Sequence, residues 1–212
     1  MDIIVDSNGE KIKSHFKAIK NKSNICLLKG KYHFESSHIY TLLSDNYENL
    51  ALSYLLTGRV QLHNTNIKIN GISISKKELE QISCYVGSSS SKKRFFNKPT
   101  VRDEINNALT FSNISMNIED IVNYFSLTPS RLDRLLKYTG NEHWRASLAI
   151  GYSNEKKIYC FPYVTEELSL ELVRLRIDEF IIRLKNEGNI IIIPSDKKTE
   201  LIKVSDELCY VK

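Results

Sequence analysis

A phosphate-binding loop is the first chemistry that the residue pattern suggests. Residues 25–43, ICLLKGKYHFESSHIYTLL, read as a strand, a loop and the beginning of an amphipathic helix. Loops in that position carry G-x-x-x-x-G-K-[ST], in which bare backbone and a lysine hold phosphate groups. Counting from Gly30 places His33 and Glu35 where glycines belong, Ser36 where the lysine belongs, and Ser37 at the hydroxyl position. The pattern therefore predicts a nucleotide site that lacks most of the groups needed to bind phosphate.

The length and composition fit one globular domain. The chain has 212 residues, 42% of them hydrophobic, which is enough for a sizeable core. Its formal net charge of +5 comes from 30 basic and 25 acidic residues mixed along the sequence, as in an ordinary solvated surface. No apolar run reaches the roughly 20 residues that span a bilayer, and the first residues lack the pattern of a signal peptide. These features predict a cytoplasmic protein.

Cysteine and histidine spacing does not predict a metal site. The four cysteines are far apart in the sequence and are expected to be reduced, buried thiols: Cys26, Cys84, Cys160 and Cys209. The sequence has no C-x-x-C pair and no His/Cys cluster, so no metal ligands are assigned. The remaining candidates are expected to lie at the surface or to cap backbone groups: His33, His38, His63 and His143.

An alternating set of strands and helices must position these residues. Apolar runs and turn signals predict strands at 2–5, 12–19, 25–28, 60–62, 67–69, 82–86, 157–161, 189–193, 201–204 and 208–211. Periodicity and capping residues predict helices at 37–44, 75–81, 102–111, 117–137 with a break at 128–129, 144–151 and 166–187. Residues 45–56 fit either a strand or a helical turn. Strands first, a helical insert near 100–150 and a final βαβ unit predict an α/β fold with a central parallel sheet.

Six segments in a fixed order carry a resemblance to a known family. They are TGRVQLHNTNI (57–67), ISCYVGSS (82–89), PTVRDEI (99–105), YTGNEHWRASLAIGY (138–152), KIYCFP (157–162) and EGNIIIIPSD (187–196). With this order and spacing, the chain resembles the ATPase domain of ABC transporters over nearly its whole length. The resemblance implies a single domain over 1–212. Its P-loop NTPase-like core, with a mainly parallel sheet and an antiparallel β subdomain, would occupy 1–98 and 152–212, and a helical lobe would occupy about 99–151.

The signature segment of that family is the part matched best. YTGNEHWRASLAIGY is similar to the family's L-S-G-G-Q-x-Q-R-x-x-L-A-x-A-L pattern, and its signature-like positions are Thr139, Gly140, Asn141 and Glu142. Thr139 can replace the family's serine hydroxyl, and Gly140 permits close backbone approach. In the family this segment opens a helix and reaches across a dimer to the γ-phosphate of ATP held by the other subunit. The resemblance therefore implies an ATPase partner.

The departures from the family pattern fall on the positions that perform hydrolysis. Ser88 stands for the Q-loop glutamine, Cys160 and Phe161 for the Walker B aspartate and the catalytic glutamate, and Ser195 for the switch histidine. No catalytic residue is assigned for that reason. Phosphoryl transfer depends on positioning, metal ions and electrostatics. With these losses, the resemblance implies that ATP and Mg²⁺ bind weakly or not at all, and that hydrolysis is poor.

Two functions fit this reading best. The first is a degenerate ATP-binding subunit of an ABC transporter, peripheral at the cytoplasmic face of the membrane. It would pair, as a hetero- or homodimer, with a competent ATPase subunit and with a membrane permease. The alternative is a stand-alone pseudo-ATPase that serves as a regulatory or protein-binding module.

Two further hypotheses stay open. A divergent ATPase would need a carboxylate near Ser37, for which the candidates are Glu166, Glu167 and Asp196. Nucleic-acid binding would rest on one short basic and aromatic stretch at 92–96, KKRFF. Such binding would depend steeply on salt, and we expect no nucleic-acid partner.

Overall fold

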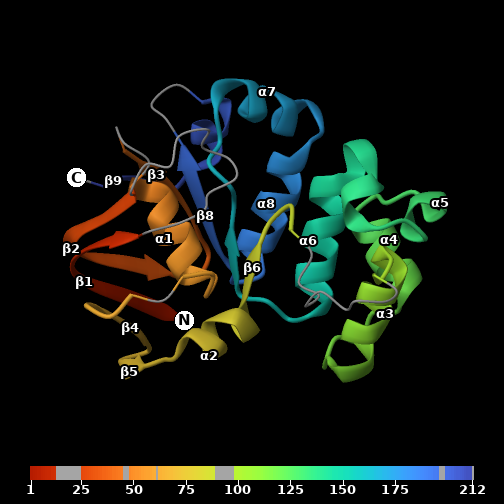
Figure 1. Cartoon of the computed structure of the whole chain (residues 1–212). Helices are drawn as coiled ribbons and strands as arrows, with labels where there is room; N and C mark the ends of the chain where they lie inside the picture. Colours follow the sequence, from red (N-terminus) through yellow and green to blue (C-terminus); the bar gives the residue numbers. More distant parts are fainter. Residues whose placement is uncertain (13–24, 45–47, 61, 89–97, 196–198, 212) are drawn as a thin grey trace.

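Two β-sheets, with a helix between them, form the centre of the molecule (Figure 1). The computed structural model describes residues 1–12, 25–44, 48–60, 62–88, 98–195 and 199–211. The first sheet is antiparallel, in the order β2-β1-β4-β5, and consists of β1 (Asp2–Ile12), β2 (Ile25–Glu35), β4 (Thr65–Ile69) and β5 (Ile72–Ser73). The second is parallel, in the order β6-β7-β8-β3-β9, and consists of β3 (His38–Leu43), β6 (Ser83–Tyr85), β7 (Ile158–Cys160), β8 (Ile190–Ser195) and β9 (Glu207–Tyr210).

The parallel sheet separates two hydrophobic cores. In β8, Ile191 and Ile193 pack with the helices on one face, whereas Ile190 and Ile192 pack toward the antiparallel sheet on the other. Successive side chains of a strand point to opposite faces, so a strand buried on both faces needs a continuous apolar run. The sequence IIII at 190–193 meets that need.

Helix α1 (Glu48–Leu56) fills the space between the two sheets. Its sequence, ENLALSYLL, buries every residue except Tyr54. A helix that is apolar on nearly all sides is stable only when it is surrounded by protein. Helix α1 follows β3 and contacts β2 on one side and β7 and β8 on the other.

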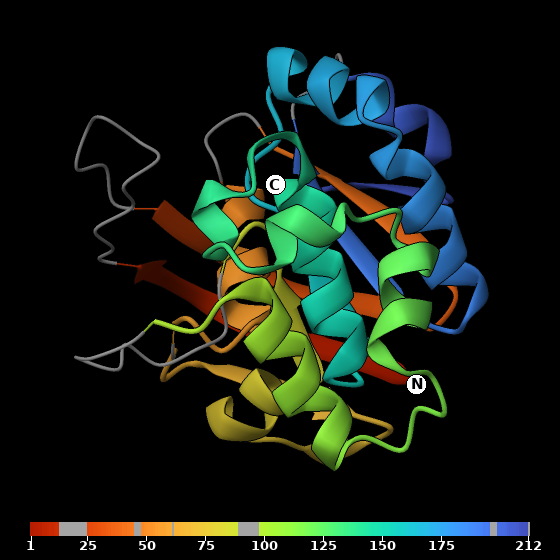
Figure 2. The ribbon, with the colours of Figure 1, turned by 90° about the vertical axis from the view of Figure 1, so that its right-hand side faces the viewer.

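Most of the remaining helices cover the far face of the parallel sheet, whereas α2 (Lys76–Ile82) packs on the side of the antiparallel sheet. Helices α6 (His143–Ser153) and α8 (Ile177–Asn186) lie against it, with α7 (Glu166–Arg174) beside α8 (Figure 1). Helices α3 (Val101–Phe111), α4 (Ile118–Tyr124) and α5 (Pro129–Leu132) pack beyond α6 and face the viewer in Figure 2. The others are α2 before β6 and the short 3₁₀ helices η1 (Leu136–Tyr138), η2 (Gly140–Glu142) and η3 (Glu200–Val204).

Local sequence explains where several helices begin. Capping boxes open α2, α3 and α4, and they pair Ser75 with Glu78, Thr100 with Asp103 and Asn117 with Asp120. Each pair satisfies backbone N–H groups that have no partner inside the helix. Hydrogen bonds from the backbone and from Ser75 or Thr100 lower the pKa values of Glu78 and Asp103, because they favour the charged carboxylates.

Most predicted elements are confirmed. The structure has the predicted α/β fold with a parallel sheet, an antiparallel sheet and helices. The expected strands near 67–69, 82–86, 157–161, 189–193 and 208–211 and the helices near 75–81, 102–111 and 144–151 are present. The helical stretch 117–137 is broken into α4, α5 and η1, and 45–56 contains a helix rather than a strand. The strand predicted at 12–19 lies outside the described residues except for Ile12.

Four predictions are wrong. The strand expected at 25–28 is present, but the loop and helix expected after it are instead the rest of the long strand β2, a turn at 36–37 and the strand β3. Residues Val60 and Leu62 lie outside any strand. The helix expected at 166–187 is two helices, because Arg176 adopts a left-handed backbone with φ of 58°. The strand expected at 201–204 is the 3₁₀ helix η3.

Neither membrane-spanning helices nor disulfides are found in the described part of the chain. None of its helices is both long and apolar enough to cross a bilayer. Cys84, Cys160 and Cys209 are free thiols, of which Cys160 is fully buried and the other two partly exposed. Burial raises the pKa of the Cys84 thiol to about 12, so it is not a reactive thiolate at neutral pH.

Candidate functional site

The carboxyl edge of the parallel sheet is where a fold of this kind binds ligands. In open α/β sheets, ligands lie outside the carboxyl ends of the strands, often at the amino end of a following helix. Here that edge is formed by the ends of β3 at Leu43, β6 at Tyr85, β7 at Cys160 and β8 at Ser195. Strand β3 leads into α1 through residues 44–47. The connection from a strand of this sheet to the following helix therefore falls between Leu43 and Glu48 and not at 30–37.

The turn that contains two of the predicted phosphate-loop residues, Ser36 and Ser37, lies at the opposite edge, whereas Gly30 belongs to a strand of the antiparallel sheet. Gly30 is in the middle of β2, and Ser36 and Ser37 form the turn between β2 and β3. The Ser37 amide donates to the carbonyl oxygen of Asn189, which precedes β8. The six residues of β3 separate this turn from the carboxyl edge, a distance of about 20 Å at roughly 3.3 Å per residue. Ser36 and Ser37 are thus not brought together with the predicted positions at the carboxyl edge, and Gly30 is a residue of a paired strand and not of a strand-to-helix loop.

Asn49, in the first turn of α1, occupies the carboxyl edge itself. Its side-chain nitrogen donates to the carbonyl oxygens of Leu42 at 2.7 Å and Ser195 at 3.0 Å, and the residue is fully buried. Its backbone amide donates to the Ser44 hydroxyl at 3.3 Å. Asn49 therefore ties the ends of β3 and β8 to the start of α1 by bonds within the protein.

The residues of this loop would not favour phosphate. The sequence from 44 to 50, SDNYENL, contains neither glycine nor lysine. It contains Asp45 and Glu48, and Glu48 is buried in the first turn of α1. Helix amino termini attract anions. A carboxylate placed there already supplies the negative charge, and it repels a second anion such as a phosphate group. Two acidic residues in this segment would oppose the binding of a nucleotide's phosphate groups.

The two positions expected to replace the Walker B carboxylates are buried in the two cores. Cys160 packs toward α1, and Phe161 packs among the helices; both have no exposed surface. Burial raises the pKa of the Cys160 thiol well above its usual value, so the thiol stays neutral. Neither side chain can supply a negative charge to hold a metal ion.

Ser195, expected at the switch position, is also committed to the protein. It is fully buried, and its hydroxyl oxygen lies 3.0 Å from the Val164 carbonyl oxygen and 2.8 Å from the Thr199 hydroxyl. A hydroxyl has one proton to donate and two lone pairs. Both contacts are internal, so Ser195 packs the edge of β8 instead of facing a ligand.

Ser88, expected at the Q-loop position, lies beside a cleft. Arg59 donates to the Ser88 hydroxyl at 2.5 Å, and its guanidinium stacks 4.0 Å from the centre of the Tyr85 ring. The cleft has a volume of about 340 Å³ and is lined by the turn after α1, by α2, by β6 and by α6. On its wall, Lys156 donates to the carbonyl oxygens of Glu80 and Gln81, and burial lowers the pKa of its ammonium group.

The signature-like segment is held by a buried carboxylate. Glu142 accepts hydrogen bonds from the backbone and hydroxyl of Thr128, and it lies 3.8 Å from both Arg131 and Arg145. Thr139 is buried and donates its hydroxyl to the carbonyl oxygen of Leu136 at 2.7 Å. The two residues between them, Gly140 and Asn141, are exposed. The loop thus presents Gly140 and Asn141, while Thr139 and Glu142 fix its shape.

A short connection joins this segment to the Q-loop position. The two ring nitrogens of His143 lie 3.1 Å from the Leu136 carbonyl oxygen and 2.9 Å from the Gly87 carbonyl oxygen. The Gly87 amide donates to the Ser147 hydroxyl at 2.8 Å. His143 and Ser147 of α6 therefore hold the backbone just before Ser88. The sequence does not predict this role for them, because they lie far from Gly87 along the chain.

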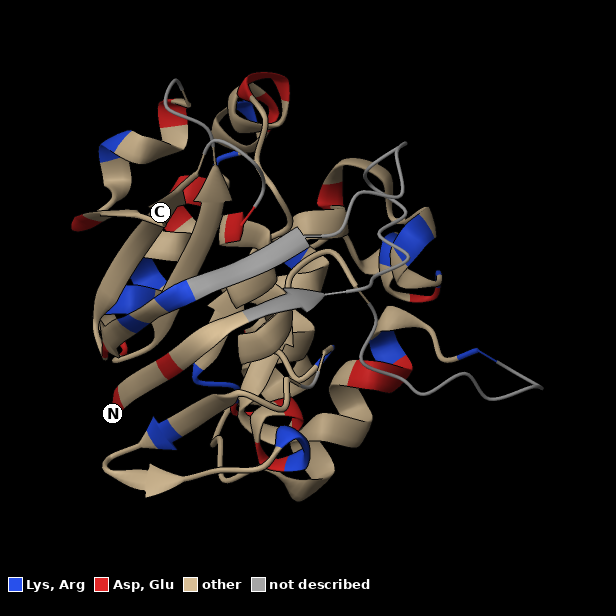
Figure 3. Ribbon diagram, turned by 60° about the vertical axis from the view of Figure 1, so that its left-hand side comes forward, with Lys and Arg blue, Asp and Glu red and all other residues tan. Residues whose placement is uncertain are grey.

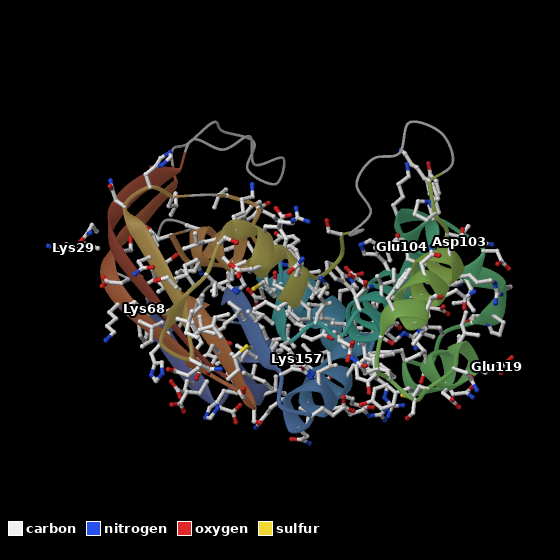
Figure 4. The ribbon with its side chains drawn as sticks, turned by 90° about the horizontal axis from the view of Figure 1, so that it is seen from below. Lys29, Lys68, Asp103, Glu104, Glu119 and Lys157 are labelled. Carbon is white, nitrogen blue, oxygen red and sulfur yellow. The ribbon has the colours of Figure 1, made fainter. Side chains whose placement is uncertain are left out.

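The weaker candidates find little support. Glu166 and Glu167 are exposed in the first turn of α7, where backbone and Thr165 hydrogen bonds lower the pKa of Glu167. Glu167 therefore caps its own helix. Asp196 and residues 92–96 lie outside the described residues. In Figure 4, Lys29 and Lys68 project from one end of the molecule, while Asp103, Glu104 and Glu119 lie on the helices at the other.

Comparisons with known proteins identify the fold. No protein-family model matches the chain, and neither does any curated protein. An ATP-binding subunit of an ABC transporter is 12% identical, with a TM-score of 0.68 over 100% of this chain and 86% of that one. CbiO1 from Clostridium perfringens, part of the ABC transporter complex CbiONQ, is 11% identical, with a TM-score of 0.67 over 99% and 84%. A dimeric ATP-binding cassette in a post-hydrolysis state, bound to ADP and Pi, is 11% identical, with a TM-score of 0.64 over 99% and 94%. The chain therefore has the P-loop NTPase-like α/β fold of the ATP-binding cassettes of ABC transporters.

Proposed function

We propose that this chain is a degenerate cassette subunit of an ABC transporter whose own nucleotide site does not hydrolyse ATP. The proposal rests on one observation: the side chains at the carboxyl edge of the parallel sheet are engaged within the protein and are not presented to a nucleotide. Asn49 and Ser195 there are bonded to other parts of the protein, and Cys160 and Phe161 are buried in the cores.

The chemistry of phosphoryl transfer explains why these substitutions matter. A cassette must neutralise the charge on the transferred phosphoryl group with a lysine and a metal ion, and it must orient the attacking water. Here Asn49 lies in the first turn after the loop and is neutral, and Cys160 cannot ligate Mg²⁺ as a carboxylate does. The loss of one positioned electrostatic group costs about 10²–10³ in rate. With several lost together, we expect little or no hydrolysis, and without the lysine and the metal carboxylate we also expect Mg-ATP to bind weakly or not at all.

The signature-like segment supports a role in a partner's site. Gly140 and Asn141 are exposed just before α6, and the Glu142 cluster holds them in place. One structural neighbour is a dimer of cassettes. In a head-to-tail pair, this segment would face ATP bound by a competent ATPase subunit, so this chain would contribute structure without hydrolysing nucleotide itself.

The cleft beside Ser88 supports a permease contact. It lies between α6 and the turn after α1, and Arg59, bonded to Ser88, is one of the residues that line it. CbiO1, another neighbour, is part of a larger transporter complex. A permease segment seated in this cleft would place the chain at the cytoplasmic face of the membrane.

The test is copurification followed by an activity measurement. When the chain is expressed in the organism that encodes it, we expect it to copurify from solubilised membranes with an ATPase subunit and a permease. In that complex, Gly140→Asp should lower ATP hydrolysis by the partner, because it places a negative charge where the γ-phosphate would lie. The matched control is Asn107→Asp, which adds the same charge at an exposed position of α3. Equal activity of both variants and wild type would overturn the proposed role in the partner's site.

A stand-alone pseudo-ATPase is the second candidate, and one observation favours it. The Thr139 hydroxyl donates to the Leu136 carbonyl oxygen, so it does not donate to a ligand. A regulatory module of this kind would copurify with soluble proteins and without a permease. The same copurification therefore separates the two functions.

A further inference from the structure

The outer face of the antiparallel sheet gathers three potential metal ligands. Asp2 in β1 pairs directly with Glu35 in β2, and Ile4 pairs with His33 two residues further along. His33 and Glu35 are separated by one residue, so they share a face of β2, which Figure 3 brings forward together with the start of β1. One ligand atom from each of the three residues lies within 4.8 Å of the other two.

The imidazole lies between the two carboxylates. His33 Nε2 is in close contact with Asp2 Oδ1 and lies 3.8 Å from Glu35 Oε1. All three side chains are about half exposed, at 52%, 42% and 56% for His33, Asp2 and Glu35. The ligand atoms are therefore open to solvent, while the strand pairing fixes the backbone beneath them.

The strand register also places two carboxylates directly opposite each other at this position. Like charges directly opposite each other on paired strands destabilise a sheet, and Asp2 and Glu35 are such a pair. In the described part of the chain, no lysine or arginine lies within 4.0 Å of either carboxylate, and the Met1 amine bonds to Ser36 instead. A divalent cation would neutralise both carboxylates.

We propose that Asp2, His33 and Glu35 bind a divalent transition-metal ion, for which Zn²⁺ has the most suitable chemistry. Zinc takes imidazole nitrogen and carboxylate oxygen together, commonly with three protein ligands and one water. Mg²⁺ and Ca²⁺ prefer oxygen ligands alone and would gain little from His33. At metal–ligand distances of roughly 2.0–2.2 Å, the ligand atoms of a tetrahedral site lie about 3.3–3.6 Å apart. The three side chains are about half exposed, so they have room to rotate to that spacing above the paired strands.

The site is independent of the nucleotide chemistry. It lies on the face of β1 and β2 turned away from α1, and it uses no residue of the carboxyl edge. A metal bound there would tie the first strand to the second, so the metal should stabilise the folded chain as well as bind to it.

The experiment is a zinc titration of the untagged, metal-free chain by calorimetry. We expect one zinc per chain, with affinity reduced by at least roughly tenfold in His33→Ala, which removes one of three ligands. The matched control is His63→Ala, which removes another exposed histidine and should leave the affinity unchanged. Equal loss in both variants, or no loss in His33→Ala, would overturn the proposal.

Two further measurements identify the ligands. Co²⁺ in place of Zn²⁺ should give absorption bands of nitrogen and oxygen ligation; a thiolate-to-metal band would assign the metal to a cysteine and contradict the site. Glu35→Gln removes the opposed charge but keeps the shape. It should leave the unfolding temperature of the metal-free chain unchanged or higher, and at equal zinc concentration it should reduce the rise produced by zinc in the wild type. A zinc-induced rise as large as that of the wild type in Glu35→Gln would exclude Glu35 as a ligand and overturn the three-residue site.

Discussion

Replacing Asn49 with aspartate tests whether its side chain holds the carboxyl edge together. The substitution keeps the shape and exchanges the NH₂ group, which donates to Leu42 and Ser195, for an oxygen. Both carbonyl oxygens would then face a carboxyl group in a fully buried position. Each buried partner left without its bond costs about 1–3 kcal/mol, so we expect a loss of about 2–5 kcal/mol at pH 7.

The loss should depend on pH with a definite sign. A buried carboxylate facing two carbonyl oxygens takes up a proton, so the carboxyl group introduced by Asn49→Asp should have a higher pKa in the folded state than in the unfolded chain. Its protonated form can still donate to one carbonyl oxygen. The deficit relative to wild type should therefore be smallest below the pKa of the carboxyl group in the unfolded chain and grow as the pH rises toward its pKa in the folded state.

Urea unfolding at several pH values measures this deficit. Asn49→Leu is the informative companion, because it loses the same donors but also removes the Asn49 Oδ1, a buried oxygen with no partner among the described residues. Its loss should be smaller than that of Asn49→Asp at pH 7. Asn107→Asp, exposed on α3, is the control and should be near neutral. A deficit of Asn49→Asp below about 0.5 kcal/mol, typical of surface changes, would refute the two hydrogen bonds.

Three other predictions concern packing and charge. Phe161→Ala should lower the free energy of unfolding in urea by about 3–5 kcal/mol, because Phe161 is fully buried. Gly87→Ala should lower the unfolding temperature more than Gly188→Ala: both have positive φ, but a Cβ at Gly87 would lie 2.7 Å from the Trp144 ring and one at Gly188 would meet nothing. Burial alone would raise the pKa of Asp206, but the hydrogen bonds from Lys185 and the Ile39 amide have the larger combined effect. The pKa of Asp206 therefore lies below its usual value. Its stabilisation should be complete at neutral pH and lost as the pH falls through the folded pKa, so acid should destabilise wild type more than Asp206→Asn in urea unfolding.

The fold could be predicted from the sequence where apolar patterns are long and bounded. The run at 190–193 can be buried on both faces only in a sheet like this one, and Thr100 with Asp103 marks the start of α3. Short runs are ambiguous between strand and helix. The pattern predicts HIYTLL at 38–43 as part of a helix, although it is a strand. The turn before it, at Ser36 and Ser37, contains no glycine or proline that would mark it in the sequence.

The candidate site could be predicted only in part, for a related reason. The positions of Cys160, Phe161 and Ser195 at strand ends follow from their apolar strands. The sequence does not predict a phosphate site between Leu43 and Glu48, because this segment has neither the glycines nor the lysine by which such sites are recognised. The grouping of Asp2 with His33 and Glu35 depends on strand register, which brings together residues that are far apart in the sequence.

The central claim is that this cassette fold has no working nucleotide site of its own. The most direct test is a calorimetric titration of the isolated chain with Mg-ATP into the millimolar range, with a competent cassette measured in parallel. We expect heat of binding for the competent cassette and none for this chain, because Asn49, Cys160, Phe161 and Ser195 offer neither a positive charge for phosphate nor a carboxylate for a metal ion. Saturable binding of Mg-ATP that is lost on changing residues of the 44–50 loop would contradict the claim.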